Sequence, residues 1–209
     1  MLHSKTALAF LAAGVFTASA CGSDDVTSED DARRAYLGLH RMIDRALNLG
    51  MDGYNAASSA NIPTQESTGD FTGTITVSGK VDQGVSANKE MSLDIVLVEY
   101  RDEILIQGDA DAGIGVAITY DTDPEEEEAP PRVDLSLRNI PNGTFTGTVN
   151  GSFAMTGDLE GHVHLDLELA GDIEEVPGSD GEIRRVPGAT TVQGVAESRY
   201  GEFVVDLEI

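Results

Sequence analysis

The chain has 209 residues and a strongly one-sided charge, with 37 Asp and Glu against 13 Lys and Arg and a formal net charge of −24 at pH 7. Nucleic-acid binding needs clustered Lys and Arg, so the composition excludes a nucleic-acid partner and disfavours direct adhesion to an anionic membrane surface. The length suits one domain, or two small ones, with a core large enough to fold without disulfides. Charge of this sign usually serves solubility, and cation binding is the functional alternative.

Residues 1–20 have the layout of a secretory signal peptide. Lys5 supplies a positive start, and an apolar run from Ala7 to Val15 follows. The run is too short to span a bilayer core of about 30 Å. Small residues then lead to Cys21, and Ala18-Ser19-Ala20 alone would fit an ordinary A-x-A cleavage site.

Cys21 is the only cysteine of the chain, and an exported lone Cys would otherwise be an unpaired reactive thiol. The segment Ala18 to Cys21 resembles the lipobox of bacterial lipoproteins, with Ala18 where the family usually has Leu. The resemblance implies that Cys21 becomes the N-terminus and carries a diacylglycerol and an amide-linked acyl chain such as palmitate. Several acyl chains anchor a protein stably to a membrane. Gly22, where Asp would imply retention in the inner membrane, implies the outer membrane of a Gram-negative host.

We expect residues 21–28 to form a lipidated tether and residues 29–53 to form an amphipathic helix. Ser28 can cap the helix, and Asp31 completes a capping-box pattern. Gly50 or Gly53 is expected to end it. Packing on a sheet is the favoured role, and a membrane-surface helix or a partner docking site are the alternatives. The apolar stripe, at three- and four-residue steps, comprises Ala32, Ala35, Tyr36, Leu39, Met42, Ile43, Ala46 and Leu47.

Residues 54–68 are rich in small polar side chains and contain Pro63, which predicts a linker. From residue 69 to residue 209, apolar residues alternate with polar ones. One buried and one wet face is typical of antiparallel sheet. An acidic run from Asp121 to Glu128 predicts a solvated loop between two strands.

Two patterns repeat within this β region. Gly69–Ile75 reads GDFTGTI, and Gly143–Val149 reads GTFTGTV. The triplet at Leu93-Asp94-Ile95 recurs at Val133, Leu165 and Val205. We therefore predict two repeat units, 69–140 and 143–209. The expected fold is mainly β: an N-terminal amphipathic helix followed by an antiparallel, internally duplicated curved sheet, open barrel or sandwich of about 8–10 strands.

The sequence offers little for catalysis, and no catalytic residue is predicted. It contains no G-x-x-x-x-G-K, H-E-x-x-H or G-x-S-x-G motif. It also has no Trp, which disfavours glycan binding on flat aromatic platforms.

Two weak metal candidates are present. His162, His164 and Asp166 alternate along one strand and so share a face, which could hold a transition metal. Asp109 and Asp111 resemble a calcium loop, although a tight turn between Ile106 and Ile114 explains them better.

Aspartates also occupy four equivalent repeat positions. Their expected role is to discourage edge-to-edge association of strands, and a shared ion site is the alternative. They are Asp94, Asp134, Asp166 and Asp206.

These features together predict an exported, lipid-anchored cell-envelope protein with a non-enzymatic structural or interaction role. Its expected partners are the membrane, through the lipid, and another envelope protein. The alternative is a carrier for an apolar ligand held between sheet and helix, which would require a lined cavity. An enzyme or a calcium-dependent adhesin is a further possibility.

Overall fold

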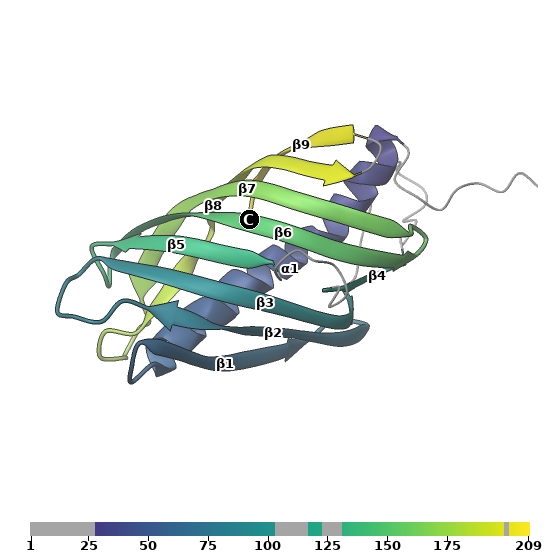
Figure 1. The fold of residues 1–209 in the computed structure, drawn as a ribbon. Coiled ribbons are helices and arrows are strands. Elements are labelled where there is room, and N and C mark those ends of the chain that lie inside the picture. Colours follow the sequence, from purple (N-terminus) through teal and green to yellow (C-terminus); the bar gives the residue numbers. More distant parts are fainter. Residues whose placement is uncertain (1–27, 103–116, 123–130, 199–200) are drawn as a thin grey trace, which may run out of the picture.

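The computed structural model describes residues 28–102, 117–122, 131–198 and 201–209. These residues form a long helix and nine strands in one antiparallel sheet, which curves around the helix (Figure 1). The predicted fold class, mainly β with an N-terminal helix and antiparallel strands, is confirmed. Of the arrangements left open by the sequence, the structure shows a single curved sheet and not a sandwich. The elements are α1 (Glu29–Ala56), β1 (Asn61–Thr68), β2 (Thr72–Val81), β3 (Lys89–Arg101), β4 (Ile118–Asp121), β5 (Arg132–Arg138), β6 (Gly143–Gly157), β7 (Gly161–Glu175), β8 (Ile183–Ser198) and β9 (Gly201–Glu208).

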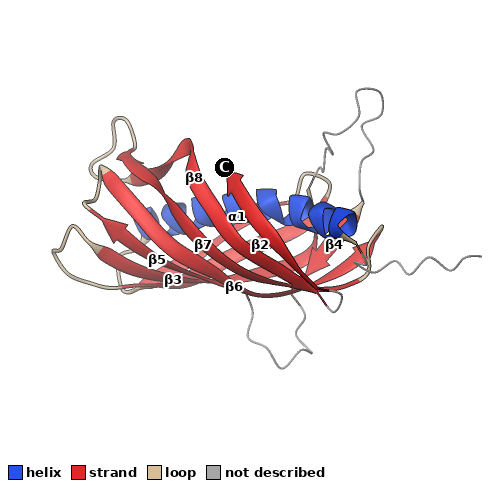
Figure 2. Cartoon of the chain, turned by 90° about the horizontal axis from the view of Figure 1, so that it is seen from above, coloured by secondary structure: helices blue, strands red, loops and turns tan. Residues whose placement is uncertain are grey.

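Helix α1 begins where the sequence predicts, because the Ser28 hydroxyl accepts a hydrogen bond from the Asp31 amide at 3.1 Å. Its apolar stripe lies against the concave face of the sheet (Figure 2). Within the described part of the chain, no helix is long and apolar enough to cross a bilayer. The buried members of the stripe are Ala35, Tyr36, Leu39, Met42, Ile43, Ala46 and Leu47.

The expected stop at Gly50 or Gly53 is wrong, since the helix continues to Ala56. Both glycines are buried on the face that meets the sheet. A Cβ at Gly50 would collide with the Leu93 side chain, and one at Gly53 would lie 2.6 Å from Ile62 Cγ2. These glycines therefore serve close approach of helix and sheet rather than termination.

The linker prediction for residues 54–68 is also wrong. After the helix, only residues 57–60 connect to β1, which pairs antiparallel with β2. The sequence of β1, NIPTQEST, does not alternate clearly between apolar and polar residues, and only Ile62 is buried. The strand could therefore not be recognised from its sequence. Pro63 is tolerated because β1 is an edge strand with a bulge between Ile62 and Gln65.

The sheet is an antiparallel meander in which β4 and β5 share one position. Both pair with β3 on one side and with β6 on the other, so they form one strand interrupted after Thr122. Of the predicted acidic loop, Asp121 belongs to β4, and residues 123–128 lie outside the described residues.

A meander places its turns alternately at two ends of the sheet. The near end holds the turns at residues 69–71 and 158–160 and the start of α1, since Tyr120 of β4 donates its hydroxyl to the Ala35 carbonyl. The far end holds the turns at residues 82–88, 139–142 and 176–182. The end of α1 lies there too, because Asn55 hydrogen-bonds both backbone groups of Ile183.

The sequence repeats fall on corresponding strands only in part. Leu93, Val133, Leu165 and Val205 are buried on β3, β5, β7 and β9. Strands β2 and β3 correspond to β6 and β7. The third pair of corresponding strands is β5 and β9, and here the repeats differ. Strand β5 pairs directly with β3, whereas β8 lies between β7 and β9.

Candidate functional site

The sequence-predicted site residues do not come together. Cys21, Asp109 and Asp111 lie outside the described residues. His162 and His164 lie on β7, where His164 Nδ1 is 3.0 Å from Ser152 Oγ. Among the described residues, no group of three or more His, Cys, Asp or Glu is arranged to hold a metal ion. The described residues therefore add no support to a metal site at His162, His164 and Asp166.

The four repeat aspartates point outward from separate strands. Asp134 pairs with Arg132 at 3.1 Å, and Asp206 accepts a hydrogen bond from Gln193 at 3.1 Å. One strand separates β5 from β7, and another separates β7 from β9. Adjacent strands lie about 4.8 Å apart, so Asp134, Asp166 and Asp206 are too widely spaced for one shared ion site. Asp94 and Asp134 lie on paired strands, but Asp94 is opposite Arg132 and Asp134 is opposite Ser92 in the register.

The interior of the curved sheet is occupied by α1 itself. Gly38, Gly50 and Gly53 bring the helix backbone onto the sheet along its length. At Gly38, a Cβ would lie 2.7 Å from Tyr120 Cε2 and 2.8 Å from Cζ. The side chains around these contacts are almost completely buried, so at these three points nothing can lie between helix and sheet.

A polar network joins the helix to the near end of the sheet. Arg45 contacts Asp70 at 3.1 Å and the buried Asp102 at 3.2 Å, and Arg41 contacts Asp70 at 2.7 Å. Asp102 also accepts hydrogen bonds from the Asp70 amide and the Tyr100 hydroxyl. Burial, and then the hydrogen bond to Asp102, raises the pKa of Tyr100. Burial alone would raise the pKa of Asp70, but hydrogen bonds from Arg41 and Arg45 outweigh it and lower that pKa.

A second network joins the helix to β8. Arg185 is 5% exposed and contacts Asp44, Asn48 Oδ1 at 3.1 Å and Thr190 Oγ1 at 2.8 Å. Buried charges of this kind are stable only when every donor has a partner. In the first network Arg45 Nε is buried without a partner, although the same guanidinium contacts Asp70 and Asp102. Both networks hold the helix against the sheet.

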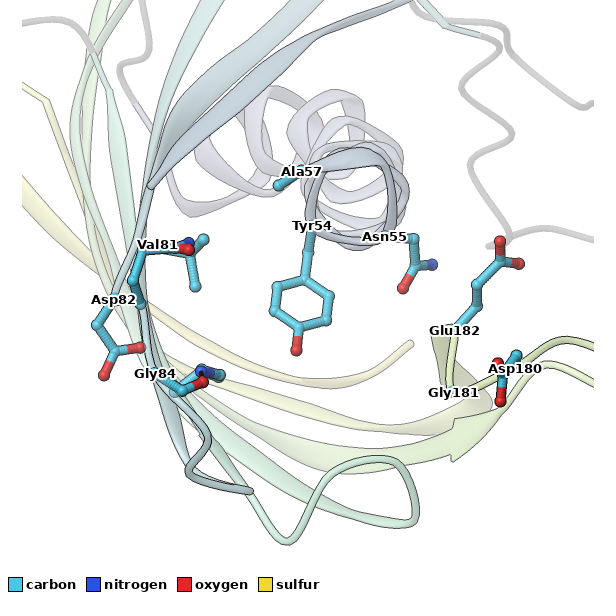
Figure 3. A pocket seen from close by; sticks show the side chains of 11 residues that line it. Tyr54, Asn55, Ala57, Val81, Asp82, Gly84, Asp180, Gly181 and Glu182 are labelled. Atoms are coloured by element: carbon cyan, nitrogen blue, oxygen red, sulfur yellow. Dashed lines mark hydrogen bonds between the residues drawn. The ribbon is translucent and has the colours of Figure 1, made fainter. Parts of the chain in front are cut away.

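The candidate site is a far-end pocket of about 320 Å³. Tyr54, from the last turn of α1, projects into its centre between two walls formed by chain turns (Figure 3). The walls come from the β2–β3 turn and the β7–β8 turn. The lining residues are Tyr54, Asn55, Ala57, Val81, Asp82, Gln83, Gly84, Lys89, Asp180, Gly181 and Glu182.

The far-end pocket is electrostatically negative. Asp82, Asp180 and Glu182 line it, whereas Lys89 directs its ammonium to the Gly84 carbonyl at 2.7 Å. Helix α1 ends here with no basic residue in its last turn, so its dipole adds negative potential. Burial, and then the charge of Asp82, raises the pKa of Tyr54. The pocket thus favours cationic over anionic groups, and no His, Ser or Cys is among its lining residues.

The outer face of the sheet carries two shallow grooves of about 680 Å³ and 350 Å³, which meet at Thr146, Gly147 and Thr148. Their polar side chains largely satisfy one another. Arg132, Ser92 and Asp134 form one cluster, and Glu90 accepts hydrogen bonds from Ser136 and Arg138 in another. No aromatic side chain lines either groove.

Neither the far-end pocket nor the outer-face grooves could be predicted from sequence, because each is assembled from turns or strands that are distant in the chain. Comparison with known proteins adds no further guide: no family model, curated protein or solved structure matches the chain.

Proposed function

We propose that the protein is a lipid-anchored component of the bacterial cell envelope with a non-enzymatic structural or interaction role. The lipobox-like segment Ala18 to Cys21, behind a signal-like N-terminus, supports the anchor. The folded part supports a role played by surfaces, because its interior is filled by its own helix.

The short distance in sequence between Cys21 and the start of α1 supports the proposal most directly. Ser28 caps α1 at the near end of the sheet, and seven residue steps separate it from Cys21. Seven extended residues reach at most about 25 Å. A lipid on Cys21 would hold the near end close to the membrane and leave the far end, with its negative pocket, facing away from it. That far end is the surface on which an envelope partner would be met.

The carrier alternative receives no support from the described residues. An apolar ligand between helix and sheet would need a lined cavity, and the helix glycines close that space at Leu93, Ile62 and Tyr120. The far-end pocket is lined mainly by polar groups and suits a cationic side chain better than an acyl chain.

Metabolic labelling tests the proposal. The full chain, expressed in a Gram-negative host fed with an alkyne-tagged fatty acid, should be labelled and should fractionate with the outer membrane. Cys21→Ser should remove both the label and the membrane association. Gly22→Asp is the matched control for sorting, since it should keep the label but move the protein to the inner membrane. Wild-type protein that is exported without label would refute the proposal.

A further inference from the structure

An exposed apolar row leads along β3 to the near end of the sheet. Val96 is 42% exposed and Val98 is 54% exposed, and both point outward from β3. The row ends at Phe71, in the β1–β2 turn, which is 57% exposed. The Arg101 guanidinium lies over the Phe71 ring at 4.9 Å from its centroid. We call Phe71, Val96, Val98 and Arg101 the near-end rim.

The rim is held in place by the backbone. Phe71 N donates to the Arg101 carbonyl at 3.1 Å, and Thr72 Oγ1 donates to the Glu99 carbonyl at 2.9 Å. The register shifts between Thr72 and Thr74 because Gly73 and Glu99 both adopt positive φ, 71° and 46°. This bulge brings Arg101 onto the outer face beside Phe71, where regular alternation after Val98 would place Tyr100.

The rim lies at the end of the sheet where the chain enters the domain. Figure 1 shows the start of α1, the β1–β2 turn and the end of β3 at the same end of the strands. Of the other exposed large apolar side chains among the described residues, Val85 lies in the far-end β2–β3 turn and Val204 lies on β9. Val204 also lies toward the near end but stands alone, so the near-end rim is the longest exposed apolar row at the end of the sheet that an anchor on Cys21 would hold near the bilayer.

We infer that the near-end rim rests on the surface of the lipid bilayer and fixes the orientation of the domain; this inference depends on the proposed lipid anchor. An apolar ring beneath a guanidinium suits the headgroup region, where the ring meets acyl chains and the cation meets phosphate. The chain as a whole is acidic, so the contact is with zwitterionic lipid and is mainly apolar.

The size of the rim favours a membrane over a protein partner. A standard protein interface buries about 800 Å² on each partner. One Phe and two Val side chains are far too small for that, since even a fully buried aromatic residue contributes only about 150–250 Å². A bilayer contact needs less, because the anchor already makes it intramolecular and raises the effective concentration of the surface.

A single-tryptophan experiment tests the inference, because the chain contains no Trp. Phe71→Trp places an indole on the rim, and Val85→Trp is the matched control in an exposed far-end turn. Each full-length lipidated protein is reconstituted into phosphatidylcholine vesicles with or without brominated acyl chains, and co-flotation is recorded. The indole at position 71 should show blue-shifted emission and loss of intensity with brominated lipid, and the indole at position 85 should show neither.

The outcomes separate the two proposals. If the protein does not float with the vesicles, the anchor fails. If it floats but the indole at position 71 behaves like the one at position 85, the anchor stands and the rim inference is overturned. That result would also be expected if a protein partner were the occupant. Val98→Trp is the second reporter should Phe71→Trp fail to fold, and it should show the same blue shift and quenching.

Discussion

The substitution Gly38→Ala tests the direct packing of helix on sheet. Gly38 is buried on the inner face of α1, directly against Tyr120 of β4. A methyl group there would collide with the Tyr120 hydroxyl and lie 2.7 Å from Cε2 and 2.8 Å from Cζ. The ring is rigid and 1% exposed, so it can relieve the clash only by moving with its strand or by shifting the helix.

The expected loss follows from three contributions. Overpacking of a well-filled core costs about 1–3 kcal/mol. Displacing the ring also breaks the hydrogen bond from Tyr120 to the Ala35 carbonyl and leaves a buried hydroxyl unpaired, which costs about 1–3 kcal/mol more. The higher helix propensity of Ala offsets about 1 kcal/mol of this destabilisation. We therefore expect destabilisation of about 3 kcal/mol.

Gly50→Ala is the matched control, because it makes the same change in the same helix. Its methyl would meet only the end of the flexible Leu93 side chain, and the next atom lies 3.6 Å away. Rotation of that side chain relieves the contact, so the propensity gain should offset most of the cost and leave stability within about 1 kcal/mol of wild type.

The assay is urea unfolding of the non-acylated Cys21→Ser mature chain, followed by far-UV circular dichroism. Unchanged slopes with shifted midpoints report stability alone. If Gly38→Ala stabilises the protein, or if Gly50→Ala destabilises it as much, the helix does not pack as described.

Three further changes probe the networks and the backbone. Asp102→Ala removes the buried acceptor of Arg45 and Tyr100 and should cost about 3–5 kcal/mol in the same urea assay; a loss below about 1 kcal/mol would mean that the network is not formed. Gly73→Ala should be more destabilising than Gly188→Ala, which has a similar φ, because only at Gly73 would the methyl strike the Glu99 backbone; equal midpoint shifts would count against the bulge. Burial lowers the pKa of His40, so as pH falls below about 6.5 the unfolded chain binds a proton before the folded chain does, and stability should decline. His40→Gln should flatten that decline in melting curves recorded between about pH 5 and 7. An unchanged slope would refute the assignment.

The fold could be predicted from sequence wherever the signal is local. Ser28 and Asp31 marked the helix start, and the stripe through Leu39 and Leu47 marked its buried face. Alternation marked most strands in the same way. These patterns depend on the periods of helix and strand, 3.6 and 2 residues, which neighbouring positions are enough to reveal.

The errors arose where a distant residue decides the outcome. Glycine often ends a helix, which is why Gly50 was expected to do so, but in the fold it packs directly against the Leu93 side chain. Pro63 favoured a linker in the sequence, yet an edge strand tolerates a proline because it needs fewer backbone donors. Arg185 interrupts the apolar pattern of β8, and its burial could not be predicted because it depends on Asp44, 141 positions away.

The sites were still less predictable. The far-end pocket takes residues from the end of α1 and from two turns about 100 positions apart in the chain, and the near-end rim needs a bulge at Gly73 to bring Arg101 beside Phe71. Lipidation of Cys21 stays a prediction, which depends on the short contiguous signal from Ala18 to Cys21.

Intact-mass spectrometry of the protein extracted from membranes under native conditions tests the lipid anchor and the filled interior together. The mature chain should begin at Cys21, bear the mass of its acyl groups and release no apolar molecule when it is unfolded. A chain without acyl groups would contradict the anchor. A stoichiometric apolar molecule released on unfolding would contradict an interior filled by the protein's own helix.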